Sequence, residues 1–195
     1  MLPSVCDYRD MLMACTHDEV NAVVVDIGSY QTKVGYAGED TPKFVYPSLV
    51  GEQGGALGGE RSCNNVGETT NGTARRLAGI HALSAPQTGM EVVSPYQGGG
   101  LLSDWEAVER LLSWGFADQM HLRMEEHPVM MAEPSGTSKA ARERTAQLLF
   151  ESCNTPAIFL SKNAVLSAFS MGRQTALIVD AGHKSTSGAC RGVAC

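Results

Sequence analysis

The sequence predicts an α/β protein in which helices cover a sheet, and three observations lead to this prediction. Short strand-like segments alternate with helix-like segments along most of the 195 residues. Two of those strand-like segments run directly into the same Asp-x-Gly sequence. Hydrophobic residues make up 43% of the chain and charged residues 18%, which is ordinary for a globular domain with a real core. Strands that alternate with helices are typical of an α/β sheet covered by helices.

The first strands of the predicted sheet lie close together near the start of the chain. Residues 22–27 and 32–37 have the composition of two strands, and the short segment 28–30 joins them. Gly38 to Pro42 is typical of a turn, and it leads into a third short strand at 44–46.

From residue 90 onward, helices and strands are predicted in strict alternation. Ser103-Asp104-Trp105-Glu106 has the pattern of a capping box, so a helix should begin there. The predicted order is a helix after 103–106, a strand at 129–132, a helix begun by Thr137 and ending near 152, a strand at 157–160, a helix at 163–171 ended by Gly172, and a strand at 175–179.

Glycine divides the predicted domain into separate segments. Because the stretch 51–89 is dense in glycine, it should bury little apolar surface and form a mobile insertion with little secondary structure. The predicted organisation is a flexible arm at 1–19, a main α/β unit formed by 20–50 and 90–172, the insertion at 51–89, and a frayed segment at 173–195 that begins a second unit.

Charge, cysteine content and hydropathy exclude several classes of protein. A formal net charge of −6 argues against a protein that binds nucleic-acid backbones or reads DNA sequence directly. The six cysteines show neither a CxxC pair nor Cys/His ligand spacing, so free thiols in a reducing compartment are expected. No apolar run reaches membrane-spanning length, and the start of the chain does not resemble a signal peptide. A soluble intracellular protein without a membrane partner is therefore expected.

The repeated Asp-x-Gly sequence is the strongest indication of chemistry. Glycine lets backbone N–H groups approach an anion closely, hydroxyl groups add donors, and a carboxylate can hold the water shell of Mg²⁺. Two such turns that face each other would clamp a phosphate tail. The copies comprise Asp26, Gly28, Ser29 and Lys33 in the first, and Asp180, Gly182, Lys184, Ser185 and Thr186 in the second.

A structural alternative stands beside this interpretation. Each Asp-x-Gly sequence could be only a tight turn after a buried strand, because short glycine motifs occur by chance. Lys33 could equally be an exposed lysine on a hairpin strand, since side chains alternate along a strand.

Several separate blocks, in matching order, resemble the actin family. They are residues 23–51, 104–112, 125–134, 139–151, the NTPAIFL segment and the AVLSAF segment. The sequence DIGSY at 26–30 and the block at 90–95 resemble the nuclear actin-related protein 4 subfamily. The resemblance implies the actin-like (ribonuclease H-like) ATPase fold, with the first lobe and a truncated part of the second lobe in this chain.

The resemblance also implies a nucleotide site that holds ATP with Mg²⁺. Asp26 and Asp180 match the carboxylates that bind the metal through water. The phosphate-binding positions match Gly28, Ser29, Lys33 and Gly182.

Two departures from the family pattern bear on catalysis. Asn163 stands where actin has the glutamine that orients the attacking water, and its side chain is one methylene shorter. An error of about 1 Å in positioning can cost roughly a hundredfold in rate. His183 and Lys184 stand where actin continues with Asp-Gly, which removes a carboxylate. No catalytic residue is therefore assigned, and ATP hydrolysis is not expected.

The subfamily resemblance implies a binding function rather than an enzymatic one. The expected protein is a non-catalytic subunit of nuclear chromatin-remodelling and histone acetyltransferase complexes, with a role in transcription regulation and an indirect connection to chromatin. Its expected partners are a long helix of a remodelling ATPase, which would dock near residues 131–169, and actin itself. The expected compartment is the nucleus, and the cytoplasm stays open as a second one. The alternative is an actin-type ATP-binding cytoskeletal protein.

Overall fold

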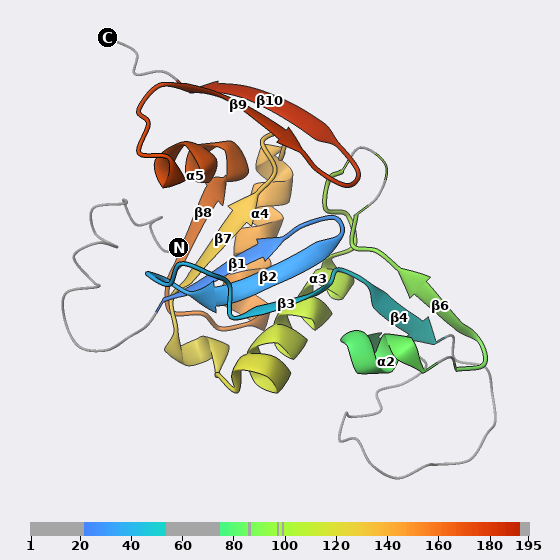
Figure 1. Ribbon diagram of the computed structural model, residues 1–195. Coiled ribbons are helices and arrows are strands. Elements are labelled where there is room, and N and C mark those ends of the chain that lie inside the picture. The colour runs from blue at the N-terminus through green and yellow to red at the C-terminus, as the bar shows by residue number, and fades with distance from the viewer. Residues whose placement is uncertain (1–21, 54–74, 86, 97, 99, 192–195) are drawn as a thin grey trace.

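A computed structural model describes residues 22–53, 75–85, 87–96, 98 and 100–191. The predicted arm at 1–19 and most of the glycine-rich stretch lie outside these residues. The centre of the described chain is a five-stranded sheet (Figure 1). Its strands, in spatial order, are β3 (Phe44–Pro47), β2 (Gln31–Tyr36), β1 (Val23–Ile27), β7 (Val129–Glu133) and β8 (Ile158–Lys162).

The sheet is mixed, and β1 lies at its centre. β1 pairs antiparallel with β2 and parallel with β7, and β7 pairs parallel with β8. In β1 the residues Val23, Val25 and Ile27 are buried and alternate with half-buried ones. Parallel pairing requires a crossover, and helices supply it on the way from β7 to β8. The predicted α/β fold class is confirmed.

Two helical segments pack their apolar sides against the sheet to form the core. The first is α3 (Trp105–Ser113), which continues as a π-helical segment, η1 (Trp114–Met120). The second is α4 (Lys139–Gln147), which continues as η3 (Leu148–Ser152). The core cluster joins side chains from these helices to the central strands, among them Val25, Leu111, Leu112, Phe116, Val129, Met131 and Leu149. A short 3₁₀ turn, η2 (Met124–Glu126), leads from η1 into β7.

Both helices begin one residue later than the sequence predicts, because different side chains cap them. Asp104, rather than Ser103, accepts a hydrogen bond from the N–H of Ala107 at the start of α3. At the start of α4, Ser138 is the capping residue, while the Thr137 hydroxyl donates to Pro134 O. In each case the residue nearer the helix has the extended backbone that a cap needs.

The glycine-rich stretch 51–89 contains regular structure at both ends, so the expectation of little secondary structure is wrong there. β4 (Val50–Gln53) pairs with β5 (Arg75–Ala78) and β6 (Met90–Val93) in a three-stranded sheet. A short helix, α2 (Ile80–Ser84), follows β5 (Figure 1). The sequence hides these strands because β4 and β5 are only four residues each and glycines flank them.

Arg76 connects this small sheet to the main body. Its guanidinium lies 2.7 Å from Asp104 Oδ1 and 3.6 Å from a carboxylate oxygen of Glu52. Arg110 donates in turn to the carbonyl of Arg76 at 3.0 Å. Burial alone would raise the pKa of the Asp104 carboxyl, but hydrogen bonds from Arg76 and from the Ala107 N–H outweigh it and lower that pKa.

The last described segment is an ordered hairpin, so the expectation that 173–195 frays is wrong for its described part. α5 (Asn163–Ser170) ends before Gly172, whose positive φ fits the predicted end of the helix. β9 (Ala176–Ala181) then pairs antiparallel with β10 (Thr186–Arg191), and α5 packs against this hairpin and β8 (Figure 1). Unlike β1, strand β9 exposes large apolar side chains such as Leu177 and Val179.

Two expectations from composition can be compared with the described residues. Cys153 is buried and Cys190 is exposed, and both are free thiols. The other four cysteines lie outside the described ranges. Within those ranges, no helix combines the length and the apolar character needed to cross a bilayer.

Candidate functional site

The two Asp-x-Gly turns have the same backbone geometry. In the first, the N–H of Gly28 donates to Gln31 O at 3.0 Å, and in the second, the N–H of Gly182 donates to Ser185 O at 2.9 Å. A Cβ at Gly28 would lie 2.8 Å from the carbonyl oxygen of Gln31, and one at Gly182 would lie 3.1 Å from that of Ser185. A side chain at Gly28 would force the backbone to shift, and one at Gly182 would need the Ser185 carbonyl to move by a few tenths of an ångström. Each glycine N–H is therefore used to close its own turn.

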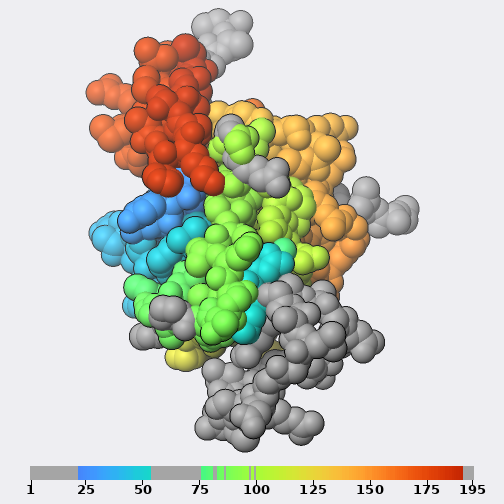
Figure 2. All heavy atoms as spheres, turned by 90° about the vertical axis from the view of Figure 1, so that its right-hand side faces the viewer, coloured from blue at the N-terminus to red at the C-terminus, as the bar shows by residue number. Residues whose placement is uncertain are grey.

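These two turns meet although more than 150 positions separate them in the chain. The backbone N–H of Lys184 donates to Ser29 Oγ at 3.3 Å. Beside this hydrogen bond, the rings of Tyr30 and His183 pack with their centroids 5.2 Å apart and their planes tilted by 49°. Figure 1 shows the tip of the β9–β10 hairpin beside the turn between β1 and β2. Figure 2 shows the hairpin seated against that part of the main body.

Asp26 and Lys33 form an ion pair in the first turn. They are direct partners across the antiparallel β1–β2 pair, and Lys33 Nζ lies 3.1 Å from Asp26 Oδ2. The Lys33 side chain therefore points toward the Asp-x-Gly turn, as the phosphate interpretation requires. On the second turn, Asp180 is exposed and lies opposite Ser187 in the hairpin register.

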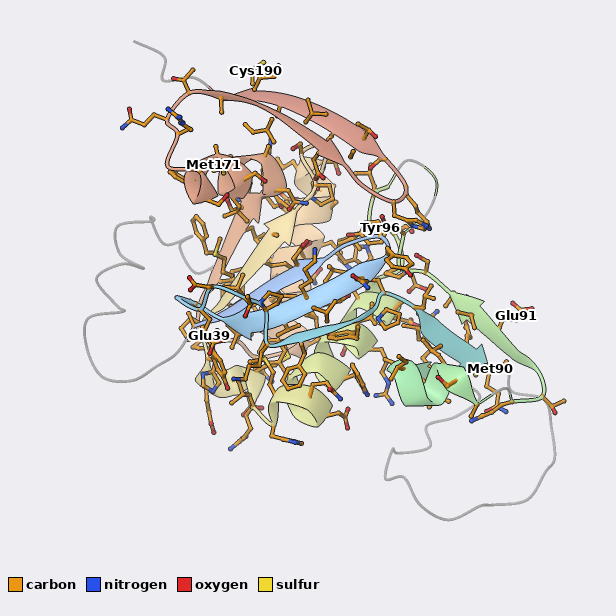
Figure 3. All side chains as sticks on the ribbon, in the orientation of Figure 1. Glu39, Met90, Glu91, Tyr96, Met171 and Cys190 are labelled. Atoms are coloured by element: carbon orange, nitrogen blue, oxygen red, sulfur yellow. The ribbon has the colours of Figure 1, made fainter. Side chains whose placement is uncertain are left out.

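Tyr96 contacts both turns, a role that sequence analysis did not predict. Its hydroxyl donates to Ile27 O, immediately before the first turn. Its carbonyl oxygen accepts a hydrogen bond from Lys184 Nζ at 2.7 Å, and the same amine lies 3.3 Å from Ser94 Oγ. Burial and, less strongly, the charge of Asp26 raise the pKa of Tyr96, so the hydroxyl stays protonated and remains a donor at neutral pH. Figure 3 labels Tyr96 close to the tip of the hairpin. An aromatic residue in a loop has no periodicity by which sequence analysis could have found it.

Asn163 lies at the edge of the sheet where the parallel strands end. β1, β7 and β8 are parallel, so Asp26, Ser135 and Asn163 all lie at or beyond the carboxyl ends of their strands. This edge is where open α/β sheets commonly bind ligands. Within the described chain, the buried atoms Ser135 Oγ and Asn163 Oδ1 have no hydrogen-bond partner. Such atoms favour a polar occupant at this edge.

Glu133 forms a separate feature on the same edge. One carboxylate oxygen lies 3.1 Å from an Arg142 nitrogen, and the other is buried without a partner among the described residues. Both Glu133 and Leu160 line a cavity of about 110 Å³, whose wall also includes Trp105. The cavity is mainly apolar in lining and does not include the residues of the two turns.

The side chains of the two turns include the kinds of group that bind phosphate and hydrated Mg²⁺. They offer a hydroxyl, two amines and two carboxylates from Ser29, Lys33, Lys184, Asp26 and Asp180. Hydroxyl and ammonium groups donate to phosphate oxygens, and carboxylates can hold Mg²⁺ through its water shell. Among the residues that the structure describes, no three His, Cys, Asp or Glu side chains cluster closely enough to hold an ion directly.

The sequence profile of the Actin family matches residues 17–190. The chain belongs to the actin family. The match includes the glycine-rich stretch and most of β10, so the likeness extends further along the chain than the sequence blocks indicated. The mixed sheet and its covering helices agree with a first lobe of the actin-like fold, as the resemblance implied.

Curated relatives of this chain carry the name actin-related protein 4. The rice protein (Oryza sativa subsp. japonica) is 41% identical over 184 residues, the Arabidopsis thaliana protein 38% over 181, and the Yarrowia lipolytica protein 35% over 172. Each alignment covers 87% of this chain, but only 41%, 41% and 38% of the respective relative. The chain therefore spans about two fifths of the length of the curated relatives that it matches. These similarities support the conclusion that this chain is an actin-related protein similar to actin-related protein 4.

Proposed function

We propose that this chain forms the phosphate-binding part of a non-catalytic actin-related subunit of nuclear chromatin-remodelling and histone acetyltransferase complexes. The observation that carries the nucleotide part is the contact between the two turns, where Lys184 N–H meets Ser29 Oγ at 3.3 Å. Two tight turns, each preceded by an aspartate, are thereby brought to one place. The ligand is ATP, and bound Mg²⁺ would supply positive charge to its phosphates.

The chain's own residues divide the work of binding. Ser29 Oγ and the N–H of Lys184, which satisfy each other in the free site, become donors for phosphate oxygens once the tail separates them. Lys33 is held beside the first turn by Asp26 and adds positive charge there. Asp26 and Asp180 hold the water shell of the metal.

Two differences from the actin sequence support a role in binding ATP without hydrolysing it. Asn163 presents its amide at the carboxyl edge of the sheet, but its side chain is one methylene shorter than the glutamine that actin uses. The family's second loop continues with an Asp-Gly pair, whereas this chain has His183 and Lys184. Hydrolysis needs a water molecule held in line with the phosphate, and both changes weaken that positioning.

The nucleotide part is tested by separating binding from turnover. Equilibrium binding of fluorescent ATP should be measurable, and phosphate release should stay at the blank rate. Asp26→Ala, which removes the partner that holds Lys33, should weaken binding, while Asp118→Ala, which changes an exposed aspartate on η1, should leave it unchanged. Phosphate release above the blank that disappears in Asp26→Ala would overturn the non-catalytic assignment.

Membership of a nuclear complex rests on similarity to the actin-related protein 4 relatives. The proposed partners are a long helix of a remodelling ATPase and actin, with chromatin reached through them, and the proposed compartment is the nucleus. Affinity purification of the tagged protein from nuclear extract, followed by mass spectrometry, should recover subunits of a remodelling or acetyltransferase complex. Sedimentation with filaments and recovery of cytoskeletal proteins instead would favour the actin-type cytoskeletal alternative.

A further inference from the structure

The side chain of Lys184 occupies an unusual electrostatic position. Its amine lies 2.7 Å from Tyr96 O and 3.3 Å from Ser94 Oγ, which are both uncharged acceptors. The ion pairs in the described part of the chain use other cations and do not include Lys184. The positive charge of Lys184 is therefore held at the junction of the two turns without an ion pair to a carboxylate of the described residues.

The backbone of Lys184 contacts the first turn. The N–H of Lys184 donates to Ser29 Oγ, so the lysine itself forms the contact between the turns. In the first turn, Lys33 is paired with Asp26 at 3.1 Å, which offsets the negative charge of that carboxylate. A polyanion entering between Ser29 and Lys184 would meet one cation from each turn.

We propose that Lys184 is a specificity-determining residue that lets this site bind polyphosphate with little dependence on Mg²⁺. The inference rests on the proposed nucleotide site and deepens it. On binding, the Lys184 amine exchanges two uncharged acceptors, Tyr96 O and Ser94 Oγ, for phosphate oxygens. Hydrogen bonds between ions are stronger than those to neutral acceptors, so the exchange favours the bound state.

The side chain can be changed without straining the backbone. Among the described residues, the only non-glycine residues with positive φ are His121 and Asn154, so Lys184 has an ordinary conformation. Lys184→Gln keeps a donor for Tyr96 O but removes the charge. Lys184→Arg keeps the charge. Lys139→Gln removes a charge from an exposed position on α4 and serves as the matched control.

The test is isothermal titration of the purified chain with ATP and with inorganic tripolyphosphate, each in excess Mg²⁺ and in excess EDTA. We expect the unmodified chain to lose no more than about threefold in affinity when Mg²⁺ is removed. In EDTA, Lys184→Gln should bind at least about tenfold more weakly, as expected for the loss of one charge-assisted hydrogen bond. Lys184→Arg and Lys139→Gln should both bind like the unmodified chain.

The outcomes separate this inference from the function on which it rests. Binding that requires Mg²⁺ and is equal in the unmodified chain and Lys184→Gln would overturn the inference and leave the nucleotide site intact. Equal losses in Lys184→Gln and Lys139→Gln would overturn it too, because net charge rather than position would then be responsible. Absence of binding to either ligand under both conditions would overturn both the inference and the proposed nucleotide site.

Discussion

β1 and β9 each lead into an Asp-x-Gly turn, but the two strands lie in very different surroundings. β1 is the central strand of a five-stranded sheet, and its Val25 is 0% exposed. β9 is one half of a two-stranded hairpin, and the corresponding Val179 is 67% exposed. The first Asp-x-Gly turn is therefore held by the core of the molecule, whereas the second is held mainly by contacts at its tip and by α5. The same motif thus lies in two turns whose strands are supported very differently by the rest of the molecule.

The largest expected contrast is in thiol reactivity, which compares Cys153 in the body with Cys190 in β10. Burial, reinforced by the charge of Glu109, raises the pKa of the Cys153 thiol to about 11, so almost no thiolate forms at pH 8. Cys190 is exposed. Iodoacetamide labelling followed by peptide mass spectrometry should modify Cys190 at least about 100-fold faster than Cys153. Similar rates would mean that the body opens as readily as the hairpin.

The second contrast compares matched valine substitutions in the two strands. Val25→Ala removes buried methyl groups from the core and should lower the free energy of unfolding by about 2–3 kcal/mol. Val179→Ala removes the same atoms from an exposed position and should change it by less than about 0.5 kcal/mol. Urea unfolding followed by circular dichroism measures both. If the two losses were equal, β9 would be buried by a partner in solution.

Tyr96→Phe tests how firmly the loop between β6 and α3 supports the first turn. The variant removes the hydroxyl that donates to Ile27 O but keeps the carbonyl that accepts from Lys184. The buried carbonyl of Ile27 loses this donor, so the expected cost is about 1–2 kcal/mol. Hydrogen exchange should rise at Gly28 and change little at Gly182. Faster exchange at Gly182 alone would show that the ring supports the second turn instead.

The smallest expected effect concerns acid stability of the main body. The pKa of Asp104 is lower in the folded chain than in the unfolded one. The Asp104 carboxylate therefore contributes fully to the free energy of unfolding above the ordinary carboxyl pKa of about 4, and this contribution is lost as pH falls through the pKa of the folded chain. Asp104→Asn still caps α3 but loses the charge pairing with Arg76, so it should cost less than about 1 kcal/mol at pH 7. The difference from the unmodified chain should shrink toward pH 3, and thermal melts at both pH values would measure it. A difference that stays constant would exclude this ion pair as its cause.

Sequence analysis predicted the main sheet well because its signals are local. The strand composition of residues 22–27 and the helix signal at 103–106 are each read from a few neighbouring residues, and the predicted fold class followed from the order of such elements. Fraying was predicted wrongly for the described residues 173–191, because small residues such as Gly188 and Ala189 hide a strand whose pairing comes from β9. The short strands of the small sheet were missed for a similar reason, since pairing rather than composition defines them.

The candidate site could be predicted only in part. Both turns were found from their repeated residues, and their facing arrangement was a consequence of the phosphate interpretation. Tyr96 contacts both turns, but it lies far from both in sequence and belongs to neither motif. The Lys184 amine donates to the backbone carbonyl of Tyr96. Every residue has such a carbonyl, so the residue type at position 96 does not indicate this contact.

Tyr96 contacts the first turn through its ring hydroxyl and the Lys184 side chain through its own carbonyl, so it links the two turns beside their direct contact. The link to the first turn runs through a rigid aromatic ring, whereas the link to the second runs through a flexible lysine side chain. The linker is therefore stiff on the side of the sheet and compliant on the side of the hairpin. A shorter residue at position 96 would release the first turn from the loop between β6 and α3 but would leave the Lys184 amine its backbone acceptor.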